Sequence, residues 1–422
     1  MSRRSGTALL LPAVFTLATA AGAADRLSIR ELRERLAAPP TRDGAQMLAA
    51  KVRRWFVPGG QGKATPLHRP GLEIQGLQAA WAVEASGANT ASIELADGQS
   101  LPMARIGGTT MFVATRDFPD GTALHWSCLA DASRLLGDGR LETFREPAEY
   151  IPRADRPHGR LARMPDRLGA TYPGTRHIWW TYVPSQYDER RPACVMVFLD
   201  GPQFTPYVPT LFDNLIAAGE MPVTVSVFVS PGIGSGGEGL TQRSFEYDRL
   251  DDRYARFLLE EILPAVEERV RLRPEPEARA IAGMSSGGIA AWTVAWQRPD
   301  AFRKVVSWVG SFTNIAAGPT GLGGGHNYEA LIRRSPRKPI RIFLQDGSRD
   351  LDTEAGNWPL ANQQMARALA YRGYDYWFAF GPGFHSDRHG RSLLPDTLRW
   401  LWRDQATIAP PPVAAGTGRD RD

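Results

Sequence analysis

The stretch Gly283-Met284-Ser285-Ser286-Gly287-Gly288 joins one apolar segment, residues 278–282, to a second, residues 289–296. The pattern G-x-S-x-G between a strand and a helix is typical of a nucleophile elbow, a sharp turn that exposes a serine oxygen above a sheet. Glycines on both sides of Ser285 permit the strained turn and a close approach of helix to strand. The N–H of Ser286, at the helix start, is expected to face a developing oxyanion.

A serine hydroxyl is a weak nucleophile near neutral pH, so Ser285 needs a base to take its proton and an acid to orient that base. In α/β hydrolases these partners follow the serine in the order acid, then histidine. The strand expected over residues 340–344 is followed by a loop with three carboxylates, Asp346, Asp350 and Asp352. We expect the acid in this loop, because α/β proteins place functional groups at strand carboxyl ends.

Two of the seven histidines, His385 and His389, lie in the loop after the strand expected over residues 376–380. His385 follows a glycine-rich stretch directly, which makes it the predicted base, whereas His389 lies nearer the next helix and is predicted to support or cap. A different interpretation stays open, in which His385, Asp387 and His389 bind a metal as an H-x-D-x-H set.

Beyond residue 152, expected strands alternate with expected helices. This alternation predicts an α/β domain over residues 153–405, with a mostly parallel sheet covered on both faces. The strands are expected at residues 177–183, 194–199, 223–229, 278–282, 304–309, 340–344 and 376–380. One amphipathic helix is expected from Asp252, with apolar residues at every fourth position and Pro264 as a possible kink.

The part of the chain before residue 153 has a different pattern of apolar residues. Residues 71–152 consist of short alternating apolar runs separated by turns, which predicts a small β-sandwich of immunoglobulin-like type. Residues 24–70 are expected to form two short helices, split by Pro39 and Pro40, and a loop. The tail, residues 406–422, is rich in proline and charge and is predicted to be disordered.

Residues 1–23 combine a charged start, a short apolar run and small residues spaced A-x-A. This pattern is typical of a cleaved secretory signal, so we expect a periplasmic or secreted protein with no stable membrane span; an uncleaved anchor is the alternative. Only Cys128 and Cys194 are present, which permits either one disulfide or two buried thiols.

Composition narrows the class of protein. The chain has 422 residues, 43% of them hydrophobic, and a net charge of +5. These values suit a globular protein with a substantial core. Its basic residues are interleaved with acidic ones, so no clustered face for nucleic acid is predicted.

From about residue 175 to 402 the chain resembles the esterase family of α/β hydrolases that contains the enterochelin (ferric enterobactin) esterases, the feruloyl esterases and the mycolyltransferases. The similar motifs are Gly283-Met284-Ser285-Ser286-Gly287-Gly288, Arg298-Pro299-Asp300-Ala301-Phe302, Gly310-Ser311-Phe312 and Arg243-Ser244-Phe245-Glu246-Tyr247. The resemblance implies an α/β-hydrolase fold. A β-sandwich ahead of the hydrolase domain is also similar to the enterochelin esterases.

The resemblance also selects site residues. The family places its acid in a G-[ST]-x-D loop, which implies Asp350, with Asp346 and Asp352 as reserves. It places its histidine in a G-x-H loop, which implies His385. It further implies that the segment Leu199-Asp200-Gly201 carries the other oxyanion donor; Pro202 has no N–H, so Gly201 or Gln203 must donate.

Arg243 and Glu246 match a segment of the siderophore esterases. Arg243 is therefore a candidate for gripping an anionic or catecholate substrate, with Glu246 as a second substrate-binding residue. The alternative is a surface ion pair between the two.

Together these features predict an exported serine esterase that acts through an acyl-enzyme and needs no metal or organic cofactor. The expected partner is a small-molecule ester of a siderophore, an aromatic acid or a sugar. Two alternatives stay open: an acyltransferase of the same fold, and a non-catalytic protein that binds a carbohydrate or siderophore.

Overall fold

The computed structural model describes residues 27–38, 41–56, 67–317 and 323–405, so the predicted signal and tail lie outside the described residues. The chain divides into two compact units, the first comprising Met1–Pro119 and Leu124–Thr143, the second comprising Asp120–Ala123 and Phe144–Asp422. Among the helices of the described residues, none has the length and apolar character needed to cross a bilayer.

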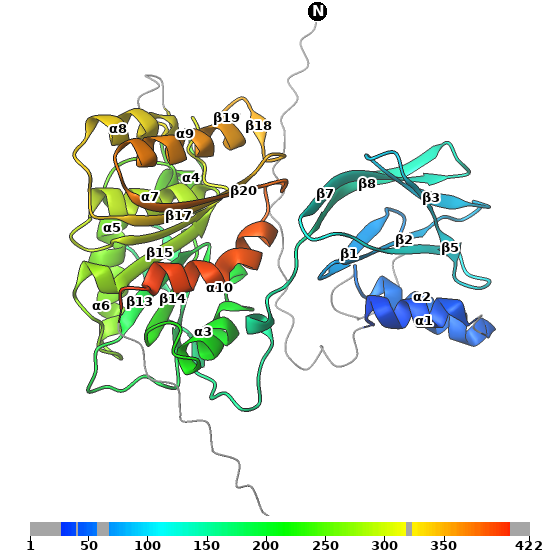
Figure 1. Ribbon diagram of the computed structural model, residues 1–422, viewed down its shortest axis with the longest axis horizontal. Helices are drawn as coiled ribbons and strands as arrows, with labels where there is room; N and C mark the ends of the chain where they lie inside the picture. Colours follow the sequence, from blue (N-terminus) through cyan, green and yellow to red (C-terminus); the bar gives the residue numbers. More distant parts are fainter. Residues whose placement is uncertain (1–26, 39–40, 57–66, 318–322, 406–422) are drawn as a thin grey trace, which may run out of the picture. The chain divides into compact units, whose positions relative to one another are not determined.

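The first unit contains two four-stranded sheets, ordered β1-β2-β6-β5 and β4-β3-β7-β8 (Figure 1). Side chains from both sheets, among them Trp81, Ile93 and Trp126, form one buried core between them. The unit is therefore a β-sandwich. Its strands are β1 (Gly71–Gln75), β2 (Gln78–Glu84), β3 (Ala91–Leu95), β4 (Ser100–Pro102), β5 (Ala104–Arg105), β6 (Met111–Asp117), β7 (Thr122–Ala130) and β8 (Arg134–Thr143).

Two helices, α1 (Ile29–Ala37) and α2 (Arg42–Arg53), cover the outer face of the β1-β2-β6-β5 sheet. Successive strand residues point to opposite faces, so Trp81 enters the sandwich core while Ala80 and Ala82 pack against the helices. The two predicted helices are thus observed, and small residues on β2 let them lie close to the sheet.

The second unit is built on an eight-stranded sheet ordered β20-β17-β16-β15-β13-β14-β12-β9. The strands from β14 to β20 run parallel, while β12 and β9 are antiparallel additions at one edge. This confirms the predicted α/β class. The strands are β9 (Arg160–Arg163), β12 (Trp179–Val183), β13 (Cys194–Leu199), β14 (Thr224–Val229), β15 (Arg279–Met284), β16 (Lys304–Trp308), β17 (Arg341–Gly347) and β20 (Asp375–Gly381).

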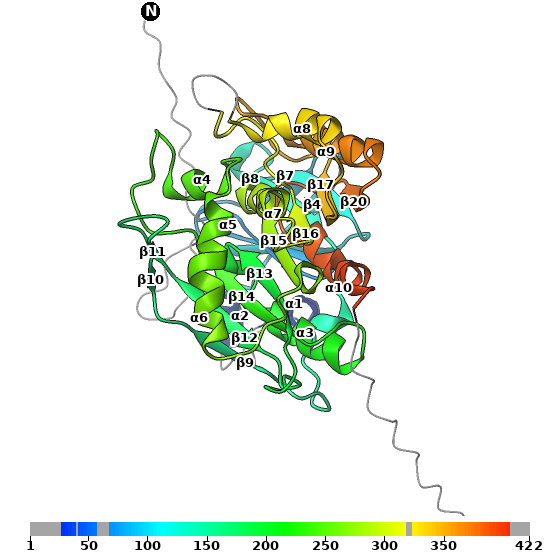
Figure 2. The ribbon, with the colours of Figure 1, turned by 90° about the vertical axis from the view of Figure 1, so that its left-hand side faces the viewer.

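Helices cover both faces of this sheet, as Figure 2 shows for α5, α6 and α7 on one face. Along β13, Val195 and Val197 face that layer, while Met196 and Phe198 face α3 and α10. Fully buried strands of this kind carry continuous apolar runs. The helices are α3 (Val208–Ala217), α4 (Gln242–Tyr247), α5 (Arg253–Phe257), α6 (Leu263–Glu267), α7 (Ser286–Gln297), α8 (Tyr328–Arg334), α9 (Trp358–Tyr371) and α10 (Arg388–Trp402).

The helix predicted from Asp252 is interrupted. A π-helical segment, Leu258–Ile262, separates α5 from α6. Proline removes one helical N–H and its ring crowds the carbonyl four residues earlier, so Pro264 disfavours regular α-helix over the turn before it. The predicted irregularity is present, but it lies in the turn before Pro264.

Cys128 and Cys194 are both buried free thiols, so the disulfide alternative is wrong. Each lies in the core of its own unit, on β7 and β13 respectively. Burial raises the pKa of each thiol to about 11, which keeps both protonated and unreactive near neutral pH.

The contact between β15 and α7 predicts a severe effect of a small substitution. A Cβ atom on Gly283 would lie 2.2 Å from the carbonyl oxygen of Gly287, well inside van der Waals contact. Gly283→Ala is expected to lower the free energy of unfolding by about 1–3 kcal/mol or more, because the backbone must move. The control is Gly108→Ala, whose added Cβ meets open space. Equal denaturant midpoints for the two variants would contradict the prediction.

Candidate active site

Ser285 occupies the turn between β15 and α7 with φ 59° and ψ −123°. A non-glycine residue at positive φ is strained and persists only where its surroundings hold it. Here the N–H of Ser285 donates to the Trp308 carbonyl at 2.9 Å, and its carbonyl accepts from the N–H groups of Gly288 at 2.9 Å and Ser311 at 3.0 Å. The strained turn predicted from the G-x-S-x-G pattern is therefore held from two sides.

Four adjacent parallel strands supply the side chains around Ser285. In the sheet they follow the order β20, β17, β16 and β15. His385 follows β20, Asp350 follows β17, Ser311 follows β16 and Ser285 follows β15. Parallel neighbours end at the same edge of a sheet, so loops far apart in sequence meet there.

A chain of hydrogen bonds joins the predicted nucleophile, base and acid. His385 Nε2 lies 2.9 Å from Ser285 Oγ, and His385 Nδ1 lies 2.5 Å from Asp350 Oδ1. The Asp350 side chain is fully buried and that of His385 is 16% exposed. Because a carboxylate only accepts, Nδ1 carries a proton toward Asp350, and the neutral imidazole presents Nε2 as the acceptor for the Ser285 hydroxyl.

Backbone bonds hold the acid and histidine loops together. The N–H of Ser348 donates to the Gly381 carbonyl at 2.8 Å, and that of Arg349 donates to the Gly383 carbonyl at 3.0 Å. A Cβ on Gly347 would lie 2.2 Å from the Gly383 carbonyl oxygen, so only glycine permits this approach. The glycines before each functional residue thus bring Asp350 within reach of His385.

The two reserve acids differ in environment. Asp352 is exposed on β18 (Asp352–Thr353), which pairs with β19 (Gly356–Asn357). Asp346 is fully buried, and its Oδ1 accepts from the Gly347 N–H at 2.8 Å. Burial, together with the neighbouring Asp350 carboxylate, raises the pKa of Asp346 well above its usual range. Asp346 is therefore a neutral carboxyl at pH 7.

His389 lies apart from the Ser285–His385–Asp350 chain. Its Nδ1 is 3.2 Å from Gln345 Nε2, and its ring stacks on Phe144 at 4.7 Å. Burial lowers the pKa of His389, so its imidazole is neutral. Both ring nitrogens of His385 are already engaged, and within the described ranges no three His, Cys, Asp or Glu side chains are grouped to hold a metal ion. The H-x-D-x-H metal interpretation is wrong.

The candidate oxyanion donors lie on two segments. Ser286 is the first residue of α7, where helical N–H groups have no partner within the helix. Gly201 and Gln203 form a 3₁₀ turn after β13, and the Gln203 N–H donates to the Asp200 carbonyl at 3.2 Å. Because the Gln203 N–H is used inside this turn, Gly201 is the better candidate of the two.

Arg243 pairs with Asp200, not with Glu246 as the ion-pair alternative expected. Its Nε and Nη2 lie 2.8 and 2.7 Å from the two Asp200 carboxylate oxygens, and Nη2 also lies 3.3 Å from the Met284 carbonyl. The Arg243 side chain is 34% exposed. It links α4, the turn after β13 and the residue before Ser285, while about a third of its side chain stays exposed.

The prediction that Glu246 binds substrate is wrong, because its side chain is fully buried. Glu246 Oε1 lies 3.0 Å from His177 Nε2 and 2.6 Å from Gln242 Nε2, and the carboxylate accepts from the Gly232 N–H. Glu246 therefore ties the glycine-rich loop after β14 to α4.

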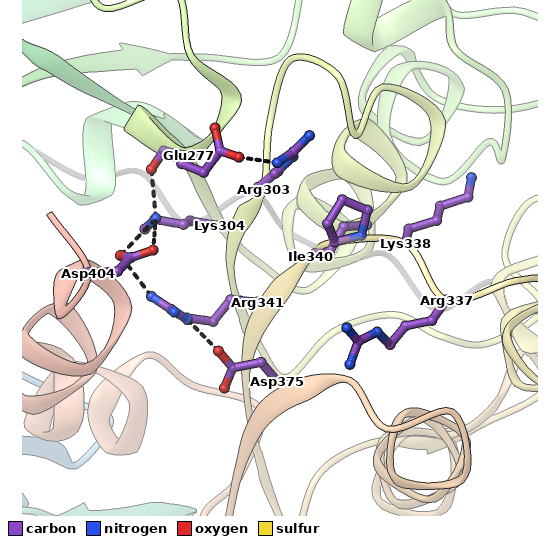
Figure 3. A pocket seen from close by; sticks show the side chains of 10 residues that line it. Glu277, Arg303, Lys304, Arg337, Lys338, Ile340, Arg341, Asp375 and Asp404 are labelled. Carbon is purple, nitrogen blue, oxygen red and sulfur yellow. Dashed lines mark hydrogen bonds and ion pairs between the residues drawn. The ribbon is translucent and has the colours of Figure 1, made fainter.

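A cavity of about 200 Å³ lies at the opposite end of the sheet, where β16, β17 and β20 begin (Figure 3). Lys304 lies 3.1 Å from Asp404, and Arg341 lies 2.7 Å from Asp375 and 3.0 Å from Asp404. Arg303 pairs with Glu277. Since the acids already pair with these cations, the cluster is a network that stabilises the base of the sheet, remote from Ser285.

Two residues beside Ser285 were not predicted as site residues. Ser311 Oγ lies 3.3 Å from Ser285 Oγ, and Trp358 Nε1 lies 3.2 Å from Ser311 Oγ. The Trp358 ring also meets the His385 ring edge-on at 5.9 Å. The sequence carries little signal for either residue. Ser311 lies in the motif Gly310-Ser311-Phe312, which resembles the esterase family, and Trp358 is one of twelve tryptophans.

Comparisons with known proteins show the family to which the chain belongs. Residues 173–401 match the family model described as "Putative esterase". The Iron(III) enterobactin esterase of Dickeya dadantii is 28% identical over 235 residues, which are 53% of this chain and 51% of that protein. The chain thus spans about half the length of this curated relative.

Solved structures share the fold. The enterobactin esterase of Shigella flexneri, crystallised in the presence of enterobactin, has a TM-score of 0.57 at 18% identity, covering 80% of this chain and 96% of that one. The ferric enterobactin esterase of Salmonella typhimurium has a TM-score of 0.55 at 16% identity, covering 80% and 97%. The fold is therefore the predicted α/β-hydrolase fold.

The buried carboxyl of Asp346 predicts a pH dependence of stability. Its folded-state pKa lies above the unfolded value of about 3.9, so the native state retains a proton that the unfolded state loses. This contribution to stability is complete below that unfolded value and falls as pH rises, by at most about 1.4 kcal/mol per pH unit. Asp346→Asn, which is neutral at every pH, is expected to flatten the decline between about pH 5 and 9.

Urea unfolding at a series of pH values measures this effect. Asp352→Asn is the matched control, because it removes an exposed carboxylate six residues further along the chain, on β18. Parallel stability curves for wild type and Asp346→Asn would show that Asp346 is not held neutral.

Proposed function

Because this chain belongs to the esterase family matched over residues 173–401, and is thus a carboxylic ester hydrolase, we propose that it is an exported serine esterase acting through an acyl-enzyme. The observation that carries the proposal is the continuous hydrogen-bond chain from Ser285 Oγ through His385 to the buried Asp350. A nucleophile, a base and an orienting acid in this order are the requirements of serine hydrolysis.

In the acylation step, Ser285 Oγ attacks the ester carbonyl carbon while His385 Nε2 takes its proton. Asp350 keeps the imidazole in the required tautomer and stabilises the imidazolium that forms. The tetrahedral intermediate collapses when His385 returns the proton to the leaving alcohol. Water then attacks the acyl-enzyme with His385 again as base, and Ser285 leaves with its proton restored.

The negative oxygen of the tetrahedral intermediate needs fixed donors. We assign this role to the N–H groups of Ser286 and Gly201, the first after the nucleophile and the second in the turn after β13. Removing one such donor costs about 3–4 kcal/mol of barrier in well-studied hydrolases. Arg243 stabilises this arrangement through Asp200, and its exposed part is placed to meet an anionic or catecholate group.

The proposed substrate class is a siderophore ester related to enterobactin. The support comes from the relatives, named as enterobactin esterases, one of them crystallised in the presence of enterobactin. Export is proposed from the charged, apolar and A-x-A segments of residues 1–23. A periplasmic or secreted enzyme would meet such an ester outside the cytoplasm.

Substitution of Ser285 tests the proposal. Ser285→Ala is expected to lower kcat for p-nitrophenyl esters, feruloyl esters and a catecholate trilactone by roughly 10⁴- to 10⁶-fold, because the residual rate comes from binding and oxyanion stabilisation alone. Wild type should be labelled at Ser285 by a fluorophosphonate, and EDTA should leave its rate unchanged. His389→Ala is the control and should retain most activity, because this histidine, the second residue of α10, takes no part in the hydrogen-bond chain.

Two results would overturn the proposal. Hydrolysis that survives Ser285→Ala would exclude Ser285 as nucleophile, and a wild type that binds the trilactone without labelling or turnover would be a binding protein. Product analysis with added alcohol acceptors separates hydrolysis from acyl transfer, since a transferase converts the acyl-enzyme to a new ester instead of a free acid.

A further inference from the structure

The hydroxyl of Ser311 contacts the proposed nucleophile directly. Ser311 Oγ lies 3.3 Å from Ser285 Oγ, and Ser311 is only 1% exposed. Its backbone N–H also donates to the Ser285 carbonyl at 3.0 Å, so the two serines are joined by both side chain and backbone. A buried hydroxyl held against a reacting oxygen is a candidate for a chemical role.

The proton positions around Ser285 determine the direction of this bond. The Ser285 hydroxyl has one proton, and the neutral His385 Nε2 accepts it at 2.9 Å. Trp358 Nε1 only donates, and it donates to Ser311 Oγ at 3.2 Å. The remaining proton in this chain belongs to Ser311, and the acceptor it meets is Ser285 Oγ. The order is therefore Trp358 to Ser311 to Ser285 to His385.

The buried side-chain amide of Asn362 holds Ser311 and Trp358 in position relative to each other. Asn362 Nδ2, on α9, donates to the Gly310 carbonyl at 2.9 Å and to the Trp358 carbonyl at 3.1 Å. It thereby locks the residue before Ser311 to the first residue of α9. The Trp358 ring in turn lies edge-on to the His385 ring at 5.9 Å. Ser311 and Trp358 are thus held against both the nucleophile and the base.

We propose that Ser311 is a further catalytic residue, which donates a hydrogen bond to Ser285 Oγ throughout the reaction, and that Trp358 is the positioning residue that orients and polarises the Ser311 hydroxyl. The inference rests on the proposed function of Ser285 as nucleophile. It assigns a donor to the serine oxygen itself, which is separate from the donors assigned to the carbonyl oxygen of the substrate.

The donor has its largest effect in deacylation. When the second tetrahedral intermediate collapses, the bond between the acyl carbon and Ser285 Oγ breaks, and its electron pair moves onto Oγ. The proton that Oγ receives comes from the imidazolium of His385, while Ser311 keeps its own. A hydrogen bond from Ser311 stabilises the charge on the departing oxygen, and donors preorganised at a site of developing charge accelerate such steps.

Three variants test the proposal with p-nitrophenyl acetate in stopped-flow measurements. Ser311→Ala removes the donor but keeps the backbone bond to Ser285. Trp358→Phe keeps an aromatic side chain and the Ser311 hydroxyl but removes the indole N–H. Ser307→Ala is the matched control: this serine is also fully buried, on β16, and its hydroxyl atom has no hydrogen-bond partner within the described residues.

Ser311→Ala is expected to lower kcat by roughly 10- to 100-fold, the factor that corresponds to losing a hydrogen bond to a charged group. Because deacylation slows most, an initial burst of p-nitrophenol approaching one per active site should precede the slow steady state. Trp358→Phe should lower kcat by about fivefold, and the double variant should match Ser311→Ala, because Trp358 acts through Ser311. Ser307→Ala should behave as wild type.

An unchanged kcat in Ser311→Ala, equal slowing of the burst and the steady state, or additive losses in the double variant would overturn the proposal. If Ser311→Ala does not fold, the Trp358→Phe variant alone tests the proposal. A deacylation rate that falls more than the acylation rate supports the proposal, and unaltered rates overturn it. Fluorophosphonate labelling of wild type distinguishes failure of this inference from failure of the proposed function. If Ser285 is not labelled, the proposed nucleophile is wrong; if it is labelled and the Ser311→Ala rates are unchanged, only the inference about Ser311 is wrong.

Discussion

The 2.5 Å hydrogen bond between His385 Nδ1 and Asp350 Oδ1 sets the direction of the protons around Ser285. It assigns the imidazole tautomer, which makes Nε2 an acceptor and Ser285 a donor, and which leaves Ser311 as the donor to Ser285. This bond depends on a close approach between the loops after β17 and β20, where Gly347 meets the backbone of Gly383. A backbone constraint in two glycine-rich loops therefore determines the chemistry available at the serine.

Buried charged and polar groups surround this site, and they divide into two kinds. All of them are buried, but the Asp350 carboxylate is hydrogen-bonded to His385, which contacts Ser285, whereas Glu246 and its partner His177 hold a loop. Asp346 belongs with the structural kind, since its raised pKa keeps it neutral at pH 7. A carboxylate in a loop near the nucleophile is thus functional only where its oxygens can reach the reacting groups.

The sequence predicted the fold class and the strands that carry the site, because long apolar runs and glycine-rich turns are local signals. The predicted strand at residues 194–199 coincides with β13, and the G-x-S-x-G turn adopts the strained backbone that its glycines permit. Edge strand β9, Arg160–Arg163, was missed because its pattern is polar and short. The substrate role of Glu246 and the alternative ion pair between Arg243 and Glu246 were wrong, because a motif reveals neither burial nor the partner from another loop.

By itself the sequence determined the α/β class and the strands whose following loops carry a serine, acids and a histidine, since both follow from local patterns and from the rule that functional groups gather at strand carboxyl ends. The expected order of these groups came from the α/β-hydrolase pattern, and the choice of Asp350 came from the family resemblance. Only the tertiary structure decided the contacts: Asp200 as the partner of Arg243, Asp346 as a neutral neighbour of Asp350, and Ser311 with Trp358 against Ser285. These pairs join residues from different loops, and hydrogen bonding between them depends on distances and burial that no single segment specifies.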